Sequence, residues 1–97
     1  MRVIFSDLAR HELDDATVFL EIQNFGLGRR FHVEILATVR RIQSFPRAWP
    51  VERPDIRKCV IRRFSYKILY SIEADHIFII AVAHQHRQPD YWMDLSS

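Results

Sequence analysis

The chain has 97 residues, a length that fits one domain, so we expect a single domain over residues 1–97. Hydrophobic residues make up 48% of it, which excludes a disordered chain and suggests that a partner covers some apolar surface. The longest apolar run, Ile77–Ala83, is far too short to cross a membrane, and the opening Met1–Phe5 is too short for a signal peptide. These observations predict a cytoplasmic protein. The one cysteine, Cys59, has no partner for an internal disulfide, and we expect a buried thiol.

The net charge of +2 hides an uneven distribution. Residues 1–25 contain two arginines against five carboxylates, a net charge of −3. Residues 40–67 contain nine arginines and lysines against two carboxylates, a net charge of +7. A basic segment of this size indicates contact with nucleic acid or with an acidic protein segment, and composition leaves both open.

The first elements are a short strand over Arg2–Phe5 and a helix from Asp7 to about Asn24. Ser6 is suited to cap this helix, because its hydroxyl accepts a hydrogen bond from a free backbone N–H of the first turn. Apolar residues recur at helical spacing and predict a buried stripe. The stripe consists of Ala9, Leu13, Ala16 and Leu20, widened by Phe19, Ile22 and Phe25.

A second helix follows the only two glycines, Gly26 and Gly28, which mark a tight connection within a helix hairpin. It ends before Pro46, which cannot continue a helix. Because prolines recur at 46, 50 and 54, we expect a loop there rather than a strand. The apolar face of the second helix contains Phe31, Ile35, Val39 and Ile42, with Leu36 beside them.

Three strands complete the chain, over Ile56–Arg63, Tyr66–Ile72 and His76–His84, with Ala74-Asp75 as the last turn. The middle strand alternates in polarity, and we expect Tyr66 and Tyr70 to pack toward the helices. The order β-α-α-β-β-β predicts an α+β fold, with the helix hairpin on one face of a small, twisted, mainly antiparallel sheet. The opposite face is expected to be partly open and to carry basic residues.

Five segments match a known pattern in order and spacing across nearly the whole chain. They are Ser6…Ala9…Leu13, Gly26-Leu27-Gly28-Arg29-Arg30-Phe31, Ile42-x-x-Phe45-Pro46, Arg62-Arg63-Phe64-x-Tyr66-x-Ile68-x-Tyr70 and Ala81-Val82-Ala83-His84-x-x-Arg87-x-Pro89-x-Tyr91-Trp92. Together they resemble the RelE/ParE superfamily, the toxins of type II toxin–antitoxin systems. The fold of that superfamily agrees with the element order read from the sequence.

The resemblance implies two alternative activities. RelE-like toxins cut mRNA on the ribosome without a metal, whereas ParE-like toxins bind DNA gyrase and poison it. In both branches a cognate antitoxin wraps the toxin with a helix and an extended segment. A third alternative is an inactive, antitoxin-binding member of the superfamily.

The residues favour the ParE-like, plasmid-stabilisation branch. RNA cleavage needs a general base, a general acid and cations that stabilise the phosphorane. In the resemblance, Lys67 and Gln85 stand where a RelE-like nuclease has arginines, and lysine lacks the planar fork of arginine. Only Arg87 and Tyr91 match that pattern, and the ending Arg87-x-Pro89-x-Tyr91-Trp92 resembles ParE. If the chain is a nuclease, the catalytic candidates are Arg63, Lys67, His84, Arg87 and Tyr91, or a Glu52, Arg63 and His84 set from another branch.

We expect Arg57, Arg63 and Arg87 to bind the target, which is DNA gyrase in the favoured interpretation. Arg57 and Arg63 have the same parity in the expected first late strand, and Arg87 follows the neighbouring strand. The alternative is a solvated edge strand protected by its charges. We expect Tyr91 and Trp92 to contact the antitoxin.

Two histidines, His84 and His86, share a strand face if the last strand extends that far. A zinc site needs three or four ligands, and no third ligand of suitable spacing follows. We therefore expect no metal and no other cofactor.

Overall fold

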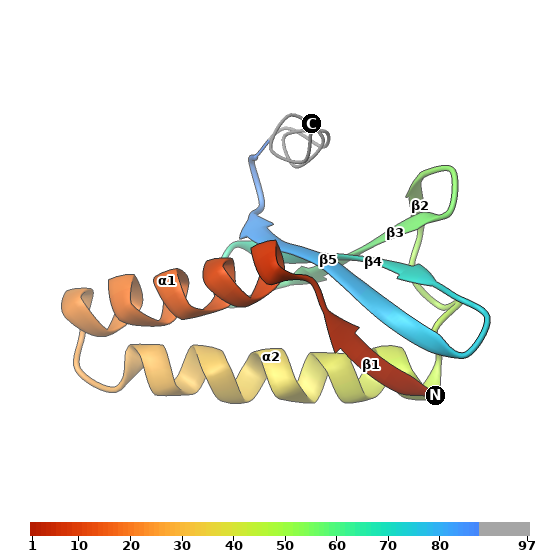
Figure 1. Ribbon diagram of the computed structural model, residues 1–97. Helices are drawn as coiled ribbons and strands as arrows, with labels where there is room; N and C mark the ends of the chain where they lie inside the picture. Colours follow the sequence, from red (N-terminus) through yellow and green to blue (C-terminus); the bar gives the residue numbers. More distant parts are fainter. Residues whose placement is uncertain (88–97) are drawn as a thin grey trace.

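The structure is a computed structural model, and it describes residues 1–87. Five strands and two helices lie in two layers, with both helices on one side of the sheet (Figure 1). The elements are β1 (Arg2–Phe5), α1 (Asp7–Gln23), α2 (Leu27–Ser44), β2 (Val51–Arg53), β3 (Ile56–Ile61), β4 (Tyr66–Ile72) and β5 (His76–His84).

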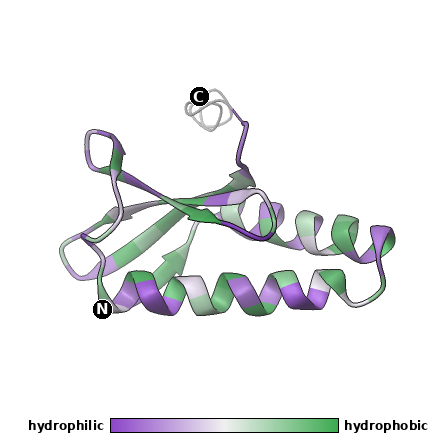
Figure 2. Cartoon of the chain, turned by 180° about the vertical axis from the view of Figure 1, so that it is seen from behind, coloured by the Kyte–Doolittle hydropathy of each residue, from purple (hydrophilic) through white to green (hydrophobic). Residues whose placement is uncertain are grey.

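The sheet has the strand order β1-β5-β4-β3-β2. β1 pairs with β5 in parallel, and the other three pairs are antiparallel. This arrangement confirms the predicted α+β fold with a mainly antiparallel sheet. The hydrophobic colour runs along most of β5 in Figure 2, as expected for a strand that has neighbours on both sides and helices over one face.

The proline-rich segment contains a strand, so the prediction of a loop throughout it is wrong. β2 occupies the three residues between Pro50 and Pro54 and pairs with the start of β3. The carbonyl of Pro50 also accepts a hydrogen bond from the N–H of Lys58 at 3.0 Å. Prolines are compatible with this strand because they flank it and because it is an edge strand.

β3 is two residues shorter than predicted. It ends at Ile61, and Arg62 to Ser65 form the turn to β4. Ser65 adopts the left-handed conformation, with φ of 55°, which reverses the chain within this short segment. Arg63 therefore lies in the turn, and the argument that it shares a strand face with Arg57 is wrong.

The helix hairpin is fixed at its start and at its connection. The Ser6 hydroxyl accepts a hydrogen bond from the N–H of Ala9 at 2.9 Å and donates one to the carbonyl of Ile80 at 2.7 Å. Gly26 connects the helices with φ of +84°. Gly28 lies so close to α1 that a Cβ atom there would be 2.4 Å from the carbonyl oxygen of Thr17. Glycine at position 28 therefore allows the two helices to approach closely.

The core lies between the hairpin and the helix-facing side of the sheet. The predicted stripe residues at 9, 13, 16 and 20 of α1 are all buried, as are those at 31, 35, 39 and 42 of α2. Tyr66 and Tyr70 face this core, as predicted, and the ring of Tyr66 lies 4.9 Å from that of Phe31. Cys59 is buried there too, and burial raises the pKa of its thiol to about 11.

Three apolar residues expected to widen the α1 stripe are exposed instead. Phe25 is 96% exposed and Ile22 is 79% exposed, and Phe19 is also exposed. Leu36 of α2, expected beside the apolar face, is exposed as well. Ile22 follows the buried Leu20 by two residues, so at about 100° per residue it lies on the far side of the helix from the stripe, and Phe25 lies past the end of α1 at the outer end of the hairpin (Figure 1). No helix within residues 1–87 is long and apolar enough to cross a membrane.

Candidate functional site

Arg57 lies near the start of β3 and holds the preceding loop in place. Arg57 is two residues from Cys59, so both side chains lie on the same face of β3, the face that meets the core beneath the helices. Its Nη1 atom donates hydrogen bonds to the carbonyl of Trp49 at 2.6 Å and to that of Arg47 at 3.3 Å. These bonds give Arg57 an architectural role. Its contact with a target stays a prediction.

Tyr70, directly opposite Arg57 in the sheet, holds the same loop from β4. Its hydroxyl donates a hydrogen bond to the carbonyl of Pro46 at 2.6 Å. Burial raises the pKa of this phenol to about 12, although the positive charge of Arg57 counteracts part of the rise. The phenol therefore stays protonated and able to donate at any physiological pH.

Arg63 and its neighbour Arg62 are exposed in the turn between β3 and β4. They border a groove of about 370 Å³ between α2 and the outer edge of β3. The groove is rich in arginine but also contains one carboxylate. Its lining residues are Glu34, Arg41, Trp49, Cys59, Val60, Ile61, Arg62 and Arg63.

The α2 side of this groove was not identified as a site from the sequence. Arg41 donates hydrogen bonds to the hydroxyl of Thr38 at 3.0 Å and to the carboxylate of Glu34 at 3.5 Å. These three residues lie on one polar face of α2, and their helical spacing was a signal that could have found the groove.

The outer edge of β3 is open along this groove. β2 pairs with Ile56 and Arg57 only, and within residues 1–87 no strand pairs with this edge over Cys59–Ile61. The N–H of Lys58 points away from β4, because it donates to the carbonyl of Pro50. In an antiparallel strand every second residue directs its N–H and carbonyl to the same edge, so those of Val60 also point away from β4. The groove therefore has one wall of unpaired strand backbone and others that carry arginines.

The remaining nuclease candidates gather at the same end of the sheet as Arg63 but differ in accessibility. Lys67 is only 3% exposed, and its Nζ atom donates a hydrogen bond to the carbonyl of Arg87 at 2.9 Å. It points to the side of the sheet away from the helices. Arg87 itself is exposed. The ammonium of Lys67 thus secures the chain after β5 rather than presenting its charge to a ligand.

His84 ends β5 on the opposite, helix-facing side. Its ring packs at 5.6 Å from that of Tyr66, and its Nδ1 accepts the N–H of His86 at 3.3 Å. Gln85 is exposed in the following turn, where its N–H donates to the carbonyl of Ser65 at 2.7 Å. Lys67 and His84 therefore face different sides of the sheet and do not converge on one reacting phosphate.

Glu52 lies far from these residues. It is on β2, three strands away from β5, which corresponds to about 14 Å across the sheet. Its Oε1 atom is 3.5 Å from the ammonium of Lys58, and its Oε2 atom is buried without a hydrogen bond among the described residues. The structure therefore does not bring Glu52 together with Arg63 and His84.

Within the described part of the chain, no three histidine, cysteine, aspartate or glutamate side chains lie close enough to hold a metal ion. Tyr91 and Trp92 lie outside the described residues.

Two solved structures of toxins from toxin–antitoxin systems have a similar fold. The structure of the isolated E. coli RelE toxin is similar with a TM-score of 0.66 and 19% identity, over 98% of this chain and 95% of that chain. A structure of the chromosomal ParDE TA system from P. aeruginosa is similar with a TM-score of 0.63 and 13% identity, over 87% of this chain and 95% of that chain. At these identities the likeness establishes the fold alone. The search of curated protein sequences gave no match.

The sequence itself identifies the family. The model described as the ParE toxin of type II toxin-antitoxin system, parDE, matches residues 3–89. The chain belongs to this ParE toxin family, within the RelE/ParE superfamily that the five motifs indicated. Membership implies a cognate antitoxin as a partner.

Proposed function

We propose that this toxin acts in the cytoplasm by binding and poisoning DNA gyrase, and that its antitoxin neutralises it. The observation that carries the choice of branch is the position of Lys67. Its buried ammonium is bonded to the carbonyl of Arg87, so it is poorly placed to stabilise a phosphorane. Gln85 adds no charge beside it. Non-covalent binding of a protein–DNA complex needs only an exposed basic surface.

The exposed arginines at this end of the sheet form the proposed target contact. Arg63 lies in the turn after β3, and Arg87 follows β5, so both are at the end of the sheet where β4 begins. Arginine suits this role because it stays charged and can bind a carboxylate or phosphate through two donors. Contacts of this kind weaken as salt rises.

A paired assay tests the choice of target. In a supercoiling reaction with purified gyrase, the wild-type chain is expected to inhibit supercoiling and to stabilise cleaved DNA. In a translation reaction followed by primer extension, it is expected to leave the mRNA intact. Codon-specific mRNA cleavage would establish the RelE-like alternative, and inactivity in both assays would establish the inactive antitoxin-binding alternative.

Variants locate the contact. Arg63→Ala is expected to lower gyrase inhibition by about tenfold, in the range of one lost charge-assisted contact. Arg47→Ala is the matched control, because it removes an exposed positive charge at a distance from the turn. Equal losses from both variants would show that only the overall charge matters.

The open edge of β3 is the proposed docking site for an extended segment of the antitoxin. An added strand would pair with the outward N–H and carbonyl of Val60. Acidic side chains of the segment would meet the arginines at positions 41, 62 and 63 that border the groove. This arrangement would also cover Arg63, which accounts for neutralisation without a change in fold.

Val60→Pro tests this docking site. Proline removes the outward N–H but leaves the bonds to β4, so the fold should tolerate it at this edge. Val60→Thr is the control, because it keeps the N–H. Antitoxin affinity is expected to fall at least about tenfold in the proline variant alone. Unchanged affinity in Val60→Pro would exclude the β3 edge.

A further inference from the structure

β5 contains a β-bulge at a place where it has no neighbouring strand on one side. β1 pairs with β5 only as far as Ile79, and the chain then turns into α1. On the other side, Tyr70 of β4 also pairs with Ile79. The preceding residue of β4, Leu69, pairs with Ala81. Ile80 is therefore the extra residue of a bulge.

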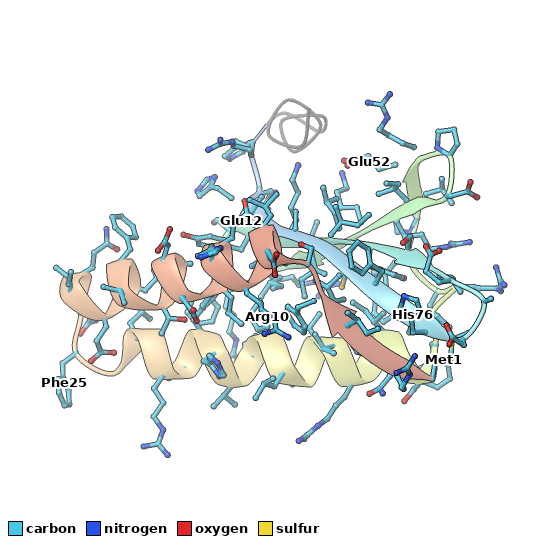
Figure 3. All side chains as sticks on the ribbon, in the orientation of Figure 1. Met1, Arg10, Glu12, Phe25, Glu52 and His76 are labelled. Carbon is cyan, nitrogen blue, oxygen red and sulfur yellow. The ribbon has the colours of Figure 1, made fainter. Side chains whose placement is uncertain are left out.

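The cap and the second turn of α1 bond to the backbone of β5 at this bulge. Consecutive carbonyls of a regular strand point to opposite edges, but those of Ile79 and Ile80 both accept hydrogen bonds from Ser6. The N–H of Ser6 donates at 2.9 Å and its hydroxyl at 2.7 Å. The N–H of Val82 donates to the Oε1 atom of Glu12 at 2.9 Å, and Figure 3 shows Glu12 projecting from α1 toward β5. The start of α1 thus replaces a neighbouring strand along this part of β5.

Glu12 satisfies a backbone donor that water reaches poorly. Val82 is 1% exposed, and its side chain belongs to the core. A buried N–H without an acceptor costs free energy, so the chain favours the register in which the N–H of Val82 stays bonded. The carboxylate of Glu12 therefore stabilises the bulged form of β5 over a regular strand.

The bulge decides how β5 continues beyond it. Ile77, Ile79 and Val82 all belong to the core, so the inward-facing positions change parity after Ile79. The bulge also sets the pairing at the end of the sheet, where Ala83 lies opposite Lys67. Loss of the bulge would move this end of β5 along β4 by one residue, about 3.3 Å, and would turn its side chains to the other face.

The backbone of Arg87 is fixed to this part of the sheet. Its N–H donates to the carbonyl of His84, the last residue of β5, at 2.9 Å. Its carbonyl accepts a hydrogen bond from the ammonium of Lys67 on β4, also at 2.9 Å. The position of Arg87 therefore depends on the register between the ends of β4 and β5.

We propose that Glu12 is a positioning residue for the target contact. Its bond to Val82 holds the end of β5 in the register that places Arg87 at the end of the sheet. Glu12 acts through β5 and does not itself contact the target. This role rests on the proposed function, in which Arg87 is part of the gyrase contact.

Two variants separate the reach of the Glu12 side chain from its charge. The separation is needed because Glu12 and Arg87 also border one hollow of about 260 Å³. Glu12→Gln removes the charge but keeps an oxygen that can accept the Val82 N–H. Glu12→Asp keeps the charge but is one methylene shorter.

Amide hydrogen exchange, measured by NMR on the purified full-length chain, tests the hold on the bulge without gyrase. The amide of Val82 is expected to exchange at least about tenfold faster in Glu12→Asp than in the wild type or in Glu12→Gln. The amides between β3 and β4 should keep their protection in all three proteins. Unchanged exchange of Val82 in Glu12→Asp would overturn the proposal.

Gyrase inhibition tests whether the bond acts through Arg87. Glu12→Asp is expected to raise the toxin concentration for half-inhibition of supercoiling by about tenfold, and Glu12→Gln by less than about twofold. Added to Arg87→Ala, Glu12→Asp should cause almost no further loss, because the contact that it positions is already gone. Multiplied losses in the double variant, or equal losses from Glu12→Asp and Glu12→Gln, would overturn the proposal. A wild type that does not inhibit gyrase would instead refute the proposed function, and the exchange of Val82 would still decide whether Glu12 holds the bulge.

Discussion

Substitution of Arg57 tests whether this residue stabilises the fold or contacts the target. The sequence alone places it among the target-binding arginines. In the structure its guanidinium spans from β3 to the carbonyls of Trp49 and Arg47. Arg57→Ala removes both hydrogen bonds and leaves the two carbonyls without this donor.

The magnitude of the effect follows from these bonds. A hydrogen bond to a charged group contributes about 1.5–3 kcal/mol to stability. Arg57 is only half-buried, and its second bond is long at 3.3 Å, so we expect the lower part of this range, a loss of about 1.5–2 kcal/mol. For a domain near 100 residues, each kcal/mol lowers the Tm by about 4–8 °C, which gives a drop of roughly 6–16 °C.

Thermal unfolding followed by circular dichroism measures this drop. Arg63→Ala is the comparison, because an exposed turn residue is expected to change stability by less than about 0.5 kcal/mol. Arg57→Lys should recover part of the loss, since lysine keeps a charged donor but not the planar fork. A Tm within about 1 °C of the wild type in Arg57→Ala would refute the architectural role, and a loss of gyrase inhibition without a loss of Tm would restore Arg57 as a contact.

Other substitutions test the packing. Gly28→Ala places a Cβ 2.4 Å from the carbonyl oxygen of Thr17. It should lower the free energy of unfolding, measured with a chemical denaturant, by about 1–2 kcal/mol, although alanine has the better helix propensity. A gain in stability would contradict the close approach of the two helices. Tyr70→Phe should cost about 1 kcal/mol by loss of the bond to Pro46, measured as a lower denaturation midpoint, while gyrase inhibition stays unchanged. Because the pKa of Cys59 rises from 9.0 to about 11 on folding, this thiol should lower the free energy of unfolding by at most about 2.7 kcal/mol as pH rises from 9 to 11, and it should have no effect well below pH 9. Cys59→Ala should remove the part of the decline between pH 9 and 10, whereas Tyr70, whose pKa rises from 10.0 to about 12, lowers stability above pH 10 in both proteins. An identical profile between pH 9 and 10 in the variant would assign the decline to other groups.

The architecture was predictable because each helix and most strands carry strong local patterns. The four-residue spacing of Ala9, Leu13, Ala16 and Leu20 defines the buried side of α1, and all four are buried. The alternation in Tyr66–Ile72 defines the face of β4 that meets the helices. Ser6, Gly26 and Pro46 mark where the helices begin, connect and end. These signals act within a few residues, so a single sequence contains them.

The errors come from features that depend on distant parts of the chain. β2 forms because Val51–Arg53 meets the free edge of β3, which nothing within this three-residue segment indicates. Phe25 was assigned to the apolar stripe of α1, but the helix ends at Gln23 and the connection turns this side chain away from the core.

The site shows the same limitation. The alternation of a strand predicts that Arg57 and Arg63 lie on the same face. It does not predict that the strand ends between them, at Ile61. It also could not show that Lys67 is buried against the carbonyl of Arg87.

The proposed gyrase contact and the proposed antitoxin site share one groove, and this overlap has a consequence for neutralisation. Val60 and Arg63 border that groove, so an antitoxin strand at the edge of β3 would also hide the proposed gyrase contact. On the two proposals together, the antitoxin and gyrase compete for the toxin. Light scattering should then show that Val60→Pro does not hold the antitoxin, and a supercoiling reaction should show that Val60→Pro inhibits gyrase whether or not the antitoxin is present. If the antitoxin neutralises Val60→Pro as fully as the wild type, the edge of β3 is not the neutralising contact.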